Sequence, residues 1–129
     1  MQTKIQGEFD VTTIPQPPES NPDFAAVSRL LLDKRFHGSL DAVSHGQMLA
    51  VGGTSGWGVY VAMEKVEGTL EGRAGTFVLY HHGTMNAGGQ ELIVTVAPGS
   101  GTDELEGLAG RMAIDIRDGK HFYRFEYSI

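Results

Sequence analysis

The residues best suited to acid–base chemistry in this sequence are the adjacent pair His81 and His82. Imidazole titrates near neutral pH, so either side chain could act as a general base. The pair ends the run Gly75–Gly83, whose β-branched, aromatic and aliphatic residues are typical of a strand. Since strand side chains alternate between two faces, we expect one histidine inside the fold and the other outside. A hydrogen-bonded interior His81 and a surface His82, both without catalytic roles, remain the alternative.

Two nearby side chains offer partners for His81. Glu64 precedes it by about one strand and could orient the imidazole ring, and Tyr60 carries a phenolic proton on the same stretch. The set His81, Glu64 and Tyr60 is therefore our prediction for catalytic residues.

Four apolar or aromatic residues are our candidates for ligand contacts. Trp57 stands between two glycines at the end of a glycine-rich loop, where it could form the wall of a pocket or pack in the core. The others lie on the strand that ends in the histidines: Phe77, Leu79 and Tyr80.

Metal and phosphate motifs are weak or absent. The chain has no cysteine and no His-x-His or His-Glu-x-x-His spacing, so we predict neither a metal site nor a cofactor. Gly99–Thr102 superficially resembles a phosphate-binding loop, but it lacks the Lys-Ser/Thr pair of a P-loop. We interpret it as a connection between strands.

Alternating segments separated by glycine or proline run along the whole chain. We expect a strand from about Ser28 to continue through a bulge at Gly38, with a turn at His45-Gly46. Asp118-Gly119 is the strongest hairpin signal, because both residues tolerate positive φ. The other expected strands are 3–13, 47–51, 57–66, 75–83, 90–97, 111–116 and 121–128.

These segments predict an all-β fold with about eight strands, in a single domain over residues 1–129. Eight antiparallel strands can close into a barrel of the calycin type, which leaves no unpaired edge. Such a barrel is either filled by side chains or just wide enough for one small ligand. A two-sheet β-sandwich is the alternative.

Composition excludes several functional classes. The formal net charge is −6, whereas a nucleic-acid-binding surface must be basic. No apolar run approaches the roughly 20 residues of a membrane span, and the N-terminal segment lacks a signal-peptide pattern. We therefore expect a cytoplasmic protein that binds neither nucleic acid nor membrane.

Several short motifs together resemble a bacterial family of unknown function whose members look like allene oxide cyclase barrels. The matching segments are Phe36–Leu40, Val66–Leu70, Gly75–His81, Pro98–Thr102, Glu104-Leu105 and Gly107. The family often has Gln where Tyr80 stands and Gly where Asp103 stands, and its histidine matches His81. This resemblance implies a barrel fold, and it implies no reaction.

Three functions remain open at this point. The first is binding of a small apolar or amphipathic molecule inside the barrel. The second is a cofactor-independent isomerase or cyclase that uses His81 with Tyr60 or Glu64. The third is a ligand-free interaction module that works as a homo-oligomer through the outer face of Val78 and Tyr80.

Overall fold

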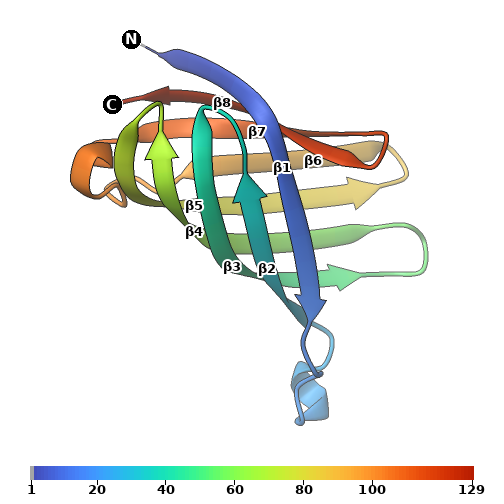
Figure 1. Cartoon of the computed structure of the whole chain (residues 1–129). Helices are drawn as coiled ribbons and strands as arrows, with labels where there is room; N and C mark the ends of the chain where they lie inside the picture. The colour runs from blue at the N-terminus through green and yellow to red at the C-terminus, as the bar shows by residue number, and fades with distance from the viewer. Residues whose placement is uncertain (1) are drawn as a thin grey trace.

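The computed structural model describes residues 2–129 and shows a closed antiparallel barrel in which each strand pairs with its neighbours in sequence (Figure 1). The predicted all-β barrel is confirmed, and the alternative of a two-sheet sandwich is not what the chain adopts. The eight strands are β1 (Thr3–Pro15), β2 (Ser28–Phe36), β3 (Leu40–Gly52), β4 (Gly58–Leu70), β5 (Arg73–Asn86), β6 (Gly89–Val96), β7 (Ala109–Arg117) and β8 (Lys120–Ser128). Two short 3-10 helices, η1 (Pro22–Phe24) and η2 (Asp103–Leu105), lie in the loops.

The structure differs from the expected bulge at Gly38 and from the expected turn at His45-Gly46. The chain turns at Gly38, which has a φ of 98°, and not at His45-Gly46, which lies within the continuous strand β3. Gly46 is needed there for contact with the next strand, because a Cβ on it would lie 2.2 Å from the carbonyl oxygen of Met63. Glycine therefore marks close strand packing at this position and a turn at Gly38.

The predicted hairpin at Asp118-Gly119 is confirmed. These two residues connect β7 to β8 with φ values of 53° and 76°. Positive φ at both central residues matches the twist of the flanking strands.

Three further connections reach the same end of the barrel as this hairpin, through the β1–β2, β3–β4 and β5–β6 loops. We call this the open end.

The opposite end of the barrel is filled by aromatic side chains, and we call it the packed end. The ring of Phe36 meets Tyr123 edge-on with centroids 5.7 Å apart, and Phe77 stacks on Phe125 at 6.1 Å. The Tyr123 hydroxyl donates a hydrogen bond to the carbonyl oxygen of His37 at 2.8 Å and accepts one from the Leu40 amide at 3.3 Å. These contacts tie the β2–β3 turn to the aromatic core.

The loop between β6 and β7 closes the packed end. Its η2 turn inserts Leu105 into the core, and Leu108 follows it. The hydroxyls of Ser100 and Thr102 each accept a hydrogen bond from a β5 amide, at 3.0 Å in both cases. The loop at Gly99–Thr102 is thus a connection that extends the pairing of β5, and Asp103 adopts a positive φ of 54° beside it.

The barrel has one weakly paired seam. Strands β6 and β7 pair only at Val94–Met112 and Thr95–Arg111, whereas β5 and β6 pair from Leu79–Val96 to Asn86–Gly89. Strands β6 and β7 therefore separate toward the open end.

Among residues 2–129, no helix is long and apolar enough to cross a membrane.

Candidate functional site

Four polar side chains lie inside the barrel, between its packed and open ends, and we call them the polar cluster: Lys34, Ser44, Glu64 and His81. They come from four consecutive strands, β2 to β5. Lys34 lies directly opposite Ser44. Glu64 lies two residues from the β4 residue directly opposite Ser44, and His81 lies two residues from the β5 residue directly opposite Glu64. The cluster therefore follows a diagonal row across the inner face, as expected from the stagger of a closed barrel.

Glu64 is the centre of this cluster. The Lys34 ammonium donates to its Oε2 at 2.7 Å, and the Ser44 hydroxyl donates to its Oε1 at 2.6 Å. The Nε2 atom of His81 also contacts Oε2. Since an ionised carboxylate only accepts hydrogen bonds, Nε2 of His81 carries the proton in this arrangement. Both oxygens of Glu64 are therefore occupied by partners from three other strands.

The surroundings of Glu64 keep it ionised. Burial is the largest influence and by itself raises the pKa, because it removes water from the charged form. The hydrogen bond from His81 and the positive charges of Lys34 and His81 act in the opposite direction. Together they prevail and lower the pKa of Glu64 from 4.5 to about 2. The carboxylate is thus a fixed buried anion at neutral pH.

Lys34 is held in place by aromatic rings as well as by Glu64. Its Nζ atom lies 5.2 Å from the ring centroid of Phe9 and 5.9 Å from that of Phe36. A desolvated ammonium over an aromatic face gains a favourable electrostatic interaction. Within residues 2–129, no buried side-chain nitrogen or oxygen is without a hydrogen-bond partner. The cluster is therefore internally satisfied, an arrangement suited to holding side chains rigidly.

A cavity of about 480 Å³ occupies the open end of the barrel, beyond the polar cluster. Its lining is mainly apolar, and Gln90, Glu91, Thr84 and Ser28 add polar atoms. The apolar and aromatic residues that line it include Met48, Ala50, Trp57, Tyr60, Met85, Leu92 and Ile116. Ile116 is 65% exposed although it is a large apolar residue. This size and chemistry fit a small ligand site.

Tyr60 connects the cavity to the polar cluster. It lines the cavity and lies four residues before Glu64 on β4, on the same face of the strand. Burial raises the pKa of Tyr60, and the negative charge of Glu64 raises it further. The ring packs over Gly83, where a Cβ would lie 2.3 Å from Cε1 of Tyr60. Tyr60 therefore presents a protonated phenol to the cavity.

The structure distributes the predicted site residues over four places. It brings His81 and Glu64 into contact, with His81 buried and His82 exposed, so the predicted division of the two histidines is confirmed. Trp57 lines the cavity, as expected of a pocket wall. Phe77 and Leu79 pack in the core instead, and Tyr80 lies on the outer face with 39% of its surface exposed. The closed barrel leaves the outer face of β5 uncovered.

Sequence reasoning missed Lys34 and Ser44. The signal for Lys34 was present, because strand alternation from Leu32 to Phe36 places this lysine on the apolar face. Ser44 was missed because we expected the strand to end in a turn at the next two residues, His45-Gly46. Among residues 2–129, no group of three His, Asp or Glu side chains could hold a metal ion.

The fold and site together define a small closed β-barrel with a packed end, a buried ionic cluster and an apolar cavity at the other end. The model of a family described as "Protein of unknown function (DUF3224)" matches residues 5–127, and the chain belongs to this family. A crystal structure of a DUF3224 protein of unknown function from Shewanella oneidensis MR-1 is similar, with 42% identity and a TM-score of 0.90. The alignment covers 100% of this chain and 98% of that one. No curated protein matches the chain.

Proposed function

We propose that this protein binds a small apolar or amphipathic molecule in the cavity at the open end of the barrel. The observation that carries the proposal is the contrast inside one barrel, where aromatic rings fill one end and apolar side chains surround a 480 Å³ cavity at the other. Covering exposed apolar residues in a concave site removes apolar surface from water, and this makes the free energy of ligand binding more favourable.

The weak seam between β6 and β7 supports a route into this cavity. Leu92 on β6 and Ile116 on β7 both line the cavity, and neither is in the part of the two strands that pairs. The strands can separate further there without breaking hydrogen bonds of the ladder between them. A ligand would therefore enter between β6 and β7 or through the loops at the open end.

The polar cluster acts in this proposal as a rigid base beneath the cavity. It fixes four strands relative to one another, so the cavity keeps its shape when it is empty. The hydroxyl of Tyr60 then provides a hydrogen-bond donor for a polar group on an amphipathic ligand. The reaction of allene oxide cyclases is not part of the proposal.

Trp57 gives a direct test, because it is the single tryptophan of the chain and it lines the cavity. Titration with medium-chain fatty acids, fatty alcohols and a fluorescent apolar probe should change Trp57 emission and saturate at one molecule per chain. Ala50→Phe fills the cavity and should abolish saturation, while Val43→Phe on the outer face of the same strand should not. Equal binding by both variants would overturn the proposal.

A cofactor-independent isomerase or cyclase is the second candidate. It is favoured by the position of Tyr60, a proton donor that lines the cavity and responds to the charge of Glu64. His81 would be its acid–base partner through Glu64. Once a ligand is identified, incubation with the wild type and Tyr60→Phe tests this role. A ligand recovered unchanged from the wild type would count against an enzyme.

A further inference from the structure

The outer face of β3, β4 and β5 carries a second apolar feature, a groove of about 850 Å³ that we call the outer groove. Leu49 faces Val61 across one pair of strands, and Met63 faces Tyr80 across the next. Met63 is 69% exposed, more than any other large apolar side chain in residues 2–129. A contiguous apolar surface of this kind marks an interaction site.

The charge around the outer groove differs from that of the molecule. The chain has a net charge of −6, yet neither Asp nor Glu lines the groove. Its basic lining residues are Arg29, His45, His81 and His82, and His81 is turned into the barrel. Asp33 borders the groove, with its Oδ1 3.3 Å from Nε2 of His45. Because no carboxylate lines the groove itself, the repulsion that keeps acidic proteins apart is weaker there.

The β1–β2 loop supplies a segment of matching chemistry, which we call the arm (residues 16–27). Figure 1 shows it extending away from the barrel, and every residue from Pro17 to Ser28 is exposed. Phe24 at η1 is 64% exposed and Val27 is 46% exposed. The arm contains Glu19 and Asp23 but neither lysine nor arginine. It is therefore an acidic segment with an unburied apolar tip.

The arm is also conformationally restricted. Pro17, Pro18 and Pro22 fix three φ angles, and the Asn21 side chain accepts a hydrogen bond from the Asp23 amide at 3.0 Å. A stiff segment loses little conformational entropy when it docks. An exposed phenylalanine on such a segment is the type of anchor that inserts into a partner.

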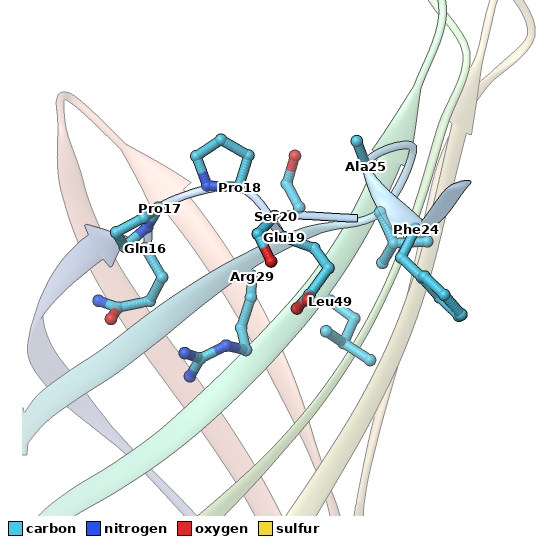
Figure 2. A pocket seen from close by; sticks show the side chains of 11 residues that line it. Gln16, Pro17, Pro18, Glu19, Ser20, Phe24, Ala25, Arg29 and Leu49 are labelled. Carbon is cyan, nitrogen blue, oxygen red and sulfur yellow. The ribbon is translucent and has the colours of Figure 1, made fainter. Parts of the chain in front are cut away.

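The hollow beneath the arm adjoins the outer groove. Figure 2 shows the hollow beneath the arm, where Glu19, Arg29 and Leu49 border the same space. Arg29 and Leu49 also line the outer groove. A partner that entered the groove would therefore meet the arm as well.

We propose that a second copy of this chain occupies the outer groove, in a two-fold dimer in which the arm of each copy lies in the groove of the other. Phe24 and Val27 would cover the apolar floor around Leu49 and Met63. Glu19 and Asp23 would approach the partner's cationic side chains. Because the two-fold axis makes the exchange of arms reciprocal, the arrangement is isologous and closes at two subunits.

Sedimentation velocity over a concentration series tests the dimer, with a subunit mass of 13.9 kDa. Met63→Glu and Phe24→Glu should each weaken dimerisation by about tenfold or more, because each places a charge in the buried centre. Val43→Glu, on the outer face of β3 but outside the groove, should leave the dimer intact. A wild-type monomer throughout, or a dimer unaffected by Met63→Glu, would overturn the proposal.

Disulfide trapping tests the arm-to-groove pairing without a disruptive charge, because the chain has no cysteine. A mixture of the Phe24→Cys and Met63→Cys proteins should form a mixed disulfide dimer upon oxidation. A mixture of Phe24→Cys with Val43→Cys should not. If Met63→Cys links only to itself and never to Phe24→Cys, the arm does not occupy the groove and the proposed pairing is wrong.

Discussion

The two ends of this barrel are made from the same eight strands, yet they are built for different tasks. At the packed end, four aromatic rings on β2, β5 and β8 pack in two pairs, and the η2 loop adds Leu105 to the same core. At the open end, Met48, Ala50 and Met85 surround a cavity together with Tyr60, Leu92 and Ile116, and β6 and β7 separate. The comparison indicates that stability is concentrated at one end, which leaves the other free to bind a ligand.

The largest effect on the free energy of unfolding is expected from a substitution at the packed end, and a substitution at the open end provides the comparison. Phe125→Ala should destabilise the fold by about 3–5 kcal/mol, because it removes a fully buried ring and leaves a void. Met85→Ala at the cavity should cost less than about 1 kcal/mol, since Met85 is 45% exposed. Urea denaturation of both variants measures the difference. Similar losses of unfolding free energy would show that the two ends do not differ as described.

The polar cluster that separates the two ends should be the next most sensitive region. Glu64→Gln should cost about 3 kcal/mol, because it leaves the buried ammonium of Lys34 without its counter-charge. The double variant Lys34→Met/Glu64→Leu removes both charges and should recover much of that loss in urea denaturation. If the double variant is less stable than Glu64→Gln, the cluster stabilises the fold through more than mutual charge compensation.

The pH dependence of stability tests whether Glu64 is held as a buried anion in the folded protein. Its pKa is lowered in the folded state to about 2 from an ordinary 4.5, so its ionisation stabilises the fold fully above pH 4.5. That contribution should fall as the pH drops from about 4.5 toward 2. Unfolding of wild type and Glu64→Gln at pH 7, 4.5 and 3 should therefore show their stability difference narrowing with acid. A constant difference would mean that folding does not lower the pKa of Glu64.

The smallest expected effect on stability concerns the rim of the cavity. A Cβ on Gly53 would lie 2.0 Å from Nε1 of Trp57, whose side chain is 44% exposed and free to shift. Gly53→Ala should change the unfolding free energy by less than about 1 kcal/mol. It should nevertheless shift the emission maximum of Trp57 and weaken apolar-probe binding. Unchanged emission would place Trp57 away from Gly53 in solution.

Much of the fold could be predicted from the sequence because it depends on local patterns. Alternation fixed the strands around Gly75–Gly83 and in β8, and Asp118-Gly119 predicted its hairpin from backbone preferences alone. The turn expected at His45-Gly46 failed because the role of Gly46 is set by Met63 on the neighbouring strand. Packing between strands distant in sequence carries no local signal.

The candidate site was predictable in part for the same reason. Alternation places His81 on the same face of its strand as Phe77 and Leu79, and its contact with Glu64 follows from adjacent strands. The role of Lys34 depends on the stagger of the barrel, which places β2 and β4 side chains in one diagonal row. The position of the cavity depends on which end the η2 loop covers, and Tyr80 was misplaced because alternation does not indicate which face of β5 is inside.

Native mass spectrometry of protein purified directly from cells tests whether the open end of the barrel holds a ligand. Wild type and Val43→Phe should carry an additional small mass at one per chain, and Ala50→Phe, with its cavity filled, should carry none. Denaturation should release the compound for identification. If wild type carries no additional mass and binds no apolar probe, or if Ala50→Phe carries the same mass, the open end is not a ligand site.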